Sequence, residues 1–88
     1  MMHGKTSSGF EYELDEAALD DYELLEDLCE LDEGNMAKTS SVLKRLIGAE
    51  QKERLKEHLR TETGRVPMSK MMAEIEEIFK NVKEGKNS

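Results

Sequence analysis

The sequence predicts a mainly α-helical protein, a small bundle of three to four helices with a short N-terminal extended segment. Apolar residues repeat with a helical period near the C-terminus, an acidic run begins with a helix-capping pattern, and residues 10–14 alternate apolar and acidic side chains. A chain of 88 residues forms one domain at most. We place this domain at residues 10–85, between a flexible arm at residues 1–9 and a tail at residues 86–88.

The extended segment has the sequence Phe10-Glu11-Tyr12-Glu13-Leu14, with three apolar residues on one face. A single strand leaves its amide groups without partners, and we find no convincing second strand in the sequence. Residues 10–14 therefore either drape over the helices as an irregular arm, or pair with another chain in a dimer or by strand addition.

The first long helix is expected to begin near Asp20, which can cap it while Glu23 reaches back, and to end at Gly34. A short helical turn at residues 16–19 precedes it. Its buried face is predicted to consist of four residues, with Leu24 and Leu31 flanking them: Tyr22, Leu25, Leu28 and Cys29.

Two further helices are expected on either side of Gly48. The first is capped by Asn35 or begins nearer Ser40, and the second covers residues 49–60. A turn at residues 61–64 leads to Pro67, which suits the first turn of the last helix. That helix is predicted over residues 67–83, with a stop at Gly85, because its apolar residues form one stripe: Met68, Met71, Met72, Ile75, Ile78, Phe79 and Val82.

The net charge of −7 is unevenly distributed along the chain. Residues 1–33 carry twelve acids and one base, whereas residues 34–88 carry eight acids and twelve bases. The acidic balance argues against nonspecific binding to nucleic acid or to anionic membranes. Either the acidic segment recognises a basic partner, or the first helix packs on the later ones and its acids face solvent.

No stretch has the length and apolarity of a membrane span, and no signal-peptide pattern is present. The single Cys29 cannot form an internal disulfide, which fits a reducing compartment, so we expect a cytoplasmic protein.

The residue pattern does not predict an enzyme, a metal site or a cofactor. His3, His58 and Cys29 lack the spacing of metal ligands, and the glycines do not form a phosphate-binding loop. Acidic neighbours disfavour the thiolate of Cys29, so we expect a buried, inert cysteine. We expect His58 to lie on the surface or to be partly packed.

Methionines cluster at the start of the last helix, where they serve either as core filler or as an adaptable surface for a partner. A chain of this size without disulfides or metal gains stability from association, which makes a homo-oligomer a possible state. The candidate partner-binding residues are Met68, Met71, Met72, Ile75 and Phe79.

Four stretches resemble the small tail assembly chaperones of siphophages and prophages of Gram-positive bacteria. They are Ser8-Gly9-Phe10-Glu11-Tyr12-Glu13-Leu14, Asp20-Asp21-Tyr22-Glu23-Leu24-Leu25-Glu26, Leu46-Ile47-Gly48-Ala49-Glu50-Gln51, and Glu57-His58-Leu59-Arg60-Thr61-Glu62-Thr63-Gly64-Arg65-Val66-Pro67. An acid is common in that family where this chain has Thr63. The resemblance implies a mostly helical protein of the host cytoplasm that binds the tape measure protein and keeps it soluble before tail-tube polymerisation.

The resemblance also implies a longer form made by translational frameshifting, for which codons of Gly85-Lys86-Asn87 can supply a slippery run. Two other functions stay open. The chain could be a structural component of the virion, or an acidic nucleic-acid mimic that binds a basic surface. The mimic would use the following acids in place of phosphates: Asp15, Glu16, Asp20, Asp21, Glu26, Asp27 and Glu30.

Overall fold

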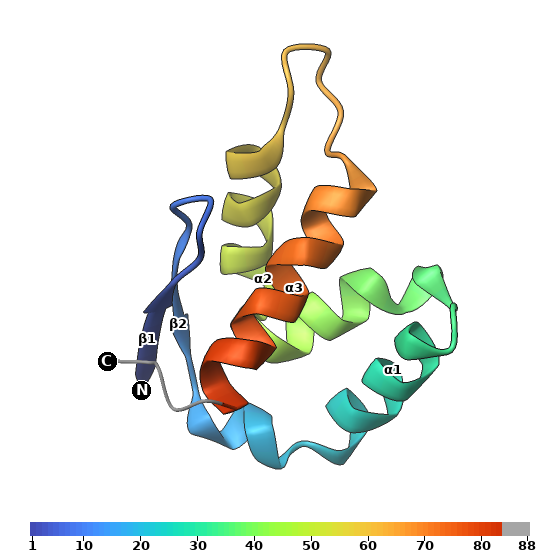
Figure 1. Cartoon of the computed structure of the whole chain (residues 1–88). Helices are drawn as coiled ribbons and strands as arrows, with labels where there is room; N and C mark the ends of the chain where they lie inside the picture. The colour runs from blue at the N-terminus through green and yellow to red at the C-terminus, as the bar shows by residue number, and fades with distance from the viewer. Residues whose placement is uncertain (84–88) are drawn as a thin grey trace.

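Three α-helices follow an N-terminal β-hairpin in the computed structural model, which describes residues 1–83 (Figure 1). The predicted fold class is therefore confirmed. The elements in chain order are β1 (Met2–Lys5), β2 (Glu11–Leu14), the 3-10 helix η1 (Glu16–Asp20), α1 (Tyr22–Asp32), the 3-10 helix η2 (Met36–Lys38), α2 (Thr39–Leu59) and α3 (Met68–Lys83). The expected helix stop at Gly85 and the tail at residues 86–88 lie outside the described residues.

The hairpin corrects two expectations about the N-terminus. Residues 1–9 do not form a loose arm, because β1 pairs antiparallel with β2, and Gly4 lies opposite Tyr12. The partner of the predicted strand thus comes from the same chain. Sequence patterning missed β1 because its central position is a glycine, over which the ring of Tyr12 lies in place of a side chain.

Side chains from the helices hold the hairpin at its turn and at its outer edge. Thr6 Oγ1 donates a hydrogen bond of 2.7 Å to Glu74 Oε1 of α3, and Ser7 N donates one of 2.6 Å to Glu77 Oε2. At the edge of β2, Gln51 Nε2 donates to the carbonyl oxygen of Glu13 at 2.6 Å, and Gln51 Oε1 accepts from Glu13 N at 2.7 Å. The hairpin is therefore bound to both α2 and α3.

Helix α1 begins one residue later than predicted, with Asp21 rather than Asp20 as its cap. Asp21 Oδ1 accepts hydrogen bonds from Glu23 N at 2.9 Å and from Leu24 N at 3.3 Å. The expected short turn before α1 is confirmed as η1, which includes Asp20 and so leaves the capping position to the next aspartate.

The predicted buried face of α1 is wrong. The face that packs on α2 consists of Leu24, Asp27 and Leu31, whereas Tyr22 is 69% exposed and Leu25 is 55% exposed. Cys29 is exposed and Leu28 is only partly buried. The helix carries two apolar stripes, and the stripe beside Asp27 is buried because that carboxylate meets cations of η2 and α2.

Gly48 divides α2 into two helical segments that run in different directions (Figure 1). Its φ of 85° and ψ of 160° lie in a region that is essentially restricted to glycine. The prediction that a helix stops at Gly48 is confirmed, and the helix before it begins at Thr39, close to the expected alternative start at Ser40. The bend lets the first segment pack on α1 while the second runs behind α3.

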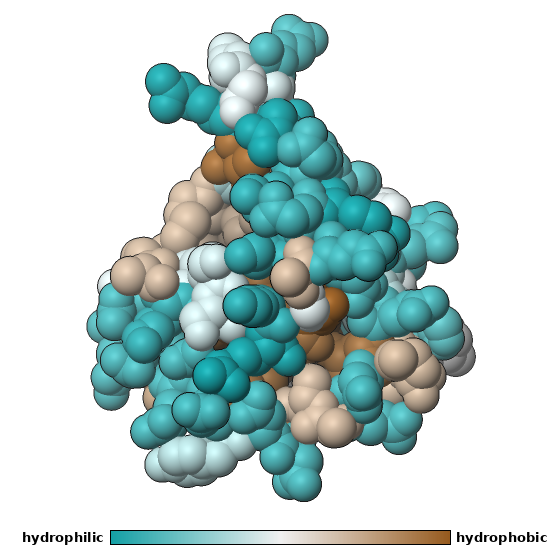
Figure 2. Space-filling view, turned by 180° about the vertical axis from the view of Figure 1, so that it is seen from behind, coloured by the Kyte–Doolittle hydropathy of each residue, from teal (hydrophilic) through white to brown (hydrophobic). Residues whose placement is uncertain are grey.

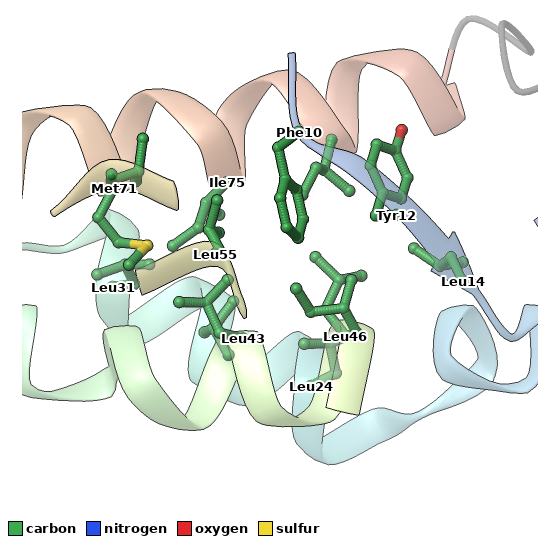
Figure 3. Packing of buried hydrophobic residues seen from close by; sticks show 14 residues of the cluster. Phe10, Tyr12, Leu14, Leu24, Leu31, Leu43, Leu46, Leu55, Met71 and Ile75 are labelled. Atoms are coloured by element: carbon green, nitrogen blue, oxygen red, sulfur yellow. The ribbon is translucent and has the colours of Figure 1, made fainter. Parts of the chain in front are cut away.

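Helix α3 confirms the predicted periodic helix and lies between the hairpin and α1 (Figure 1). Met71 and Ile75 point from α3 into the core toward Leu31, Leu43 and Leu55 (Figure 3). The core combines side chains from the hairpin and all three helices: Phe10, Tyr12, Leu14, Leu24, Leu31, Val42, Leu43, Leu46, Ile47, Leu55, Leu59, Met71, Ile75 and Ile78.

Candidate functional site

A groove of about 910 Å³ separates α1 from α3. Its floor includes Leu31 of α1 and Ile75 of α3, which are both buried. Its apolar walls are Leu28, Met72 and Phe79, which are only partly buried. The groove exists because α1 packs on the first segment of α2, while α3 packs on the hairpin and the core.

The apolar surface continues from the groove onto the exposed face of α1. Leu28 lies in the groove, Leu25 precedes it by three residues, and Tyr22 precedes Leu25 by three. At about 100° per residue, these three side chains and Cys29 share one side of the helix. We call Tyr22, Leu25, Leu28 and Cys29 the outer stripe of α1. A contiguous apolar surface of this kind is typical of a site for another macromolecule.

The face of the molecule seen from behind is covered largely by hydrophilic residues, and hydrophobic residues show between them in several places (Figure 2).

Acids of α1 that point away from the groove are held by two cations of the chain. Arg45 of α2 lies 3.5 Å from Asp21 and 3.4 Å from Glu23, measured between charged atoms. Lys38 of η2 lies 3.6 Å from Glu30. Both cations also contact Asp27, at 3.6 Å from Lys38 Nζ and 3.5 Å from Arg45 Nε. These contacts fix the orientation of α1.

Asp27 is the central group of these contacts. Its carboxylate accepts a short hydrogen bond from the Ser41 hydroxyl, and this bond lowers the pKa of Asp27 below its ordinary value. The positive charges of Lys38 and Arg45 lower the pKa further, whereas burial acts in the opposite direction. Asp27 thus has a structural role in joining α1 to α2.

Acids beside the groove have no such partners. Asp32 of α1 and Glu76 of α3 make no salt bridge with any side chain that the structure describes. Asp32 and Glu76 line the groove itself, together with Lys80. The rim of the groove is therefore predominantly negative.

The structure divides the five residues that the sequence proposed for partner binding. Met71 and Ile75 belong to the core, so a partner cannot reach them in this conformation. Met72 and Phe79 line the groove between α1 and α3. Met68 is 43% exposed and lines a second, smaller groove of about 340 Å³, where Lys52 and Lys56 supply positive charge.

The sequence analysis placed the α1 residues of this site in the core. Leu25 and Leu28 were recognised as one stripe, but the stripe was expected to face the core. The signal that could have corrected it is Asp27, which shares the opposite side with Leu24 and Leu31 and needs a cation from the rest of the chain.

The remaining candidates for chemistry have structural surroundings. His58 is exposed as expected, and its Nε2 lies 3.0 Å from the carbonyl oxygen of Ser8. Since a carbonyl oxygen can only accept, Nε2 carries a proton in this contact. Cys29 is exposed on the outer stripe, which corrects the prediction of a buried thiol.

Within residues 1–83, side chains capable of binding a metal do not gather in groups of three or more. The helices in the same range are too short or too polar to cross a bilayer.

Comparisons of the chain with protein-family models, with curated proteins and with solved structures give no match.

Proposed function

We propose that the protein is a phage tail assembly chaperone that binds the tape measure protein in the bacterial cytoplasm and keeps it soluble before tail-tube polymerisation. The observation that carries this proposal is the apolar groove between α1 and α3, with the outer stripe of α1 beside it. The four sequence stretches that resemble such chaperones support it independently.

A helix is the form of partner that the groove suits best. The walls of the groove are themselves two helices, and their apolar side chains lie along one direction on each: Leu28 and Leu31 on α1, and Met72, Ile75 and Phe79 on α3. An amphipathic helix laid between them would bury its apolar stripe against both walls. A long helical protein such as a tape measure offers many stripes of this kind, which would aggregate if left uncovered.

The walls can also adapt to stripes of different sequence. Met72 is flexible and polarisable, and it is only partly buried, so it can change rotamer without disturbing the core. The charge of −7 would keep a complex of many chaperone copies with one long chain in solution.

The nucleic-acid mimic receives less support from the same side chains. Of the seven acids proposed to replace phosphates, Asp15 and Asp21 cap helices, and Asp27 is buried against α2. These three carboxylates already have hydrogen-bonding partners within the chain, so they are poorly placed to contact a basic groove on another protein.

Co-expression tests the proposed function. Leu25→Lys and Met72→Lys together place two charges on the groove and the outer stripe, at positions where neither side chain is fully buried. We expect this variant to fold, and we expect the tape measure protein co-expressed with it to precipitate.

The matched control makes the same chemical change elsewhere. Leu19→Lys and Met36→Lys add two charges at side chains of η1 and η2 that are 43% and 42% exposed and do not line the groove. The tape measure protein should stay soluble with this control, as with the unmodified chain. If the variant with both groove substitutions, folded by circular dichroism, also keeps it soluble, the groove is not the binding site.

A further inference from the structure

We infer that the groove between α1 and α3 selects amphipathic helices whose apolar stripe is flanked by lysine or arginine. This inference rests on the proposed function, because it concerns the chemistry of the segment that the same groove binds. It adds a charge requirement, which the apolar walls alone do not impose.

The first argument is the division of the acids of α1 into two sets. Glu23, Asp27 and Glu30 form ion pairs with Arg45 and Lys38. Asp32, which lines the groove, makes no salt bridge within the described chain. Its charge is therefore available to a partner.

The second argument is the position of the unpaired acids relative to the apolar walls of the groove. Asp32 lines the groove from α1. On the opposite wall, Glu76 lies between Met72 and Phe79 in the sequence and also lines the groove.

A helix in the groove would thus meet carboxylates on both sides of its apolar contact. Lysines or arginines next to its apolar stripe would pair with them, whereas glutamates there would be repelled. Lys80 is the one cation among the groove-lining residues, and it does not change the sign of the rim. The acidic rim also attracts basic segments before contact, which raises the association rate at low salt.

The second groove has charged residues of the opposite sign from the rim of the groove between α1 and α3. Its apolar lining includes Leu43, Val66 and Met68, and its charged residues are Lys52 and Lys56. A basic helix would be repelled there. The charge requirement therefore directs such a helix to the groove between α1 and α3.

Two synthetic helical peptides with the same apolar stripe test the inference, one flanked by lysines and the other by glutamates. Binding to the full chain is measured by fluorescence anisotropy. At about 0.1 M salt, where the screening length is about 10 Å, we expect the lysine peptide to bind at least about tenfold more tightly. At about 1 M salt, where that length is about 3 Å, the difference should shrink markedly. Equal affinities at low salt overturn the inference.

A charge-reversed variant identifies the carboxylates responsible. Asp32→Lys and Glu76→Lys change two exposed side chains that line the groove and make no described ion pair, so the fold should be retained. This variant should prefer the glutamate peptide. If it still prefers the lysine peptide by the original factor, the rim acids do not set the selectivity.

The matched control changes the total charge by the same amount at two exposed acids away from the groove: Glu50→Lys and Glu62→Lys. It should keep the preference for the lysine peptide. The outcomes separate the two proposals. If the tape measure protein stays soluble with the chain but the peptides bind equally, only the charge requirement fails. If the peptides do not bind and the tape measure protein precipitates, both proposals fail.

Discussion

Met71 and Met72 are adjacent in the sequence, but an alanine substitution should reduce stability much more at Met71 than at Met72. Met71 is 5% exposed and packs in the core, whereas Met72 is partly buried in a wall of the groove. Truncating a buried methionine to alanine costs about 2–5 kcal/mol of unfolding free energy, because contacts are lost and a cavity remains. A partly exposed side chain at a groove costs less, and we expect below about 1 kcal/mol for Met72→Ala.

Urea unfolding followed by circular dichroism measures both effects. Small proteins lose about 1–3 kcal/mol of unfolding free energy per molar urea, so a loss of about 3 kcal/mol lowers the midpoint by about 1–3 M. We expect a shift of this size for Met71→Ala and a much smaller one for Met72→Ala. Equal shifts for the two variants would refute the division between core and groove.

Peptide binding gives the complementary result. Met72→Ala removes a side chain that lines the groove, and it should weaken binding of the lysine-flanked peptide by about fivefold or more, which corresponds to about 1 kcal/mol. A Met72→Ala variant that is fully stable and binds with unchanged affinity shows that this methionine does not contact the partner.

Three further substitutions test the supporting structure. Gly48→Ala should cost roughly 1–3 kcal/mol of stability in thermal or urea unfolding, since its φ of 85° and ψ of 160° suit only glycine. Gly4→Ala should lower stability by about 1–3 kcal/mol, since a Cβ atom there overlaps the ring of Tyr12; an unchanged melting temperature would contradict the packing. The pKa of Asp27 is lower in the folded state than in the unfolded state, so the folded chain binds fewer protons. The contribution of Asp27 to the free energy of unfolding is therefore complete above its unfolded pKa of about 3.9. The stability difference between the unmodified chain and Asp27→Asn should shrink as the pH falls below that value.

The helices were predictable where local signals agreed with one another. The apolar residues of α3 form one stripe, and Pro67 marks the start of the helix, so these two signals together predicted its position in the chain. Gly34 and Gly48 both have positive φ, and both interrupt helices as expected. The strand β2 was recognised from its alternation, but its partner β1 has no such pattern, because Gly4 is covered by a side chain from the opposite strand.

The orientation of α1 could not be obtained from its own residues. Its buried face has two leucines and its outer stripe has four residues, so the residue pattern favours the outer stripe for the core. The observed orientation brings Asp27 to Lys38 and Arg45, which come later in the chain. As a result, the outer stripe with Leu25 was expected to face the core, and Met71 was left open between the core and a partner surface. Periodicity identifies apolar faces, but it does not say which of them the rest of the chain covers.

The side chain of Gln51 has a consequence for contacts between copies of the chain. Its amide group offers the same donor and acceptor as a peptide unit, and it occupies both the N–H and the carbonyl of Glu13. A strand from a neighbouring molecule would have to displace it before it could add to the sheet at that point. One glutamine thus blocks a route by which copies of the chain could join into fibrils, and the exposed charges of Glu11 and Glu13 on the same strand act in the same direction.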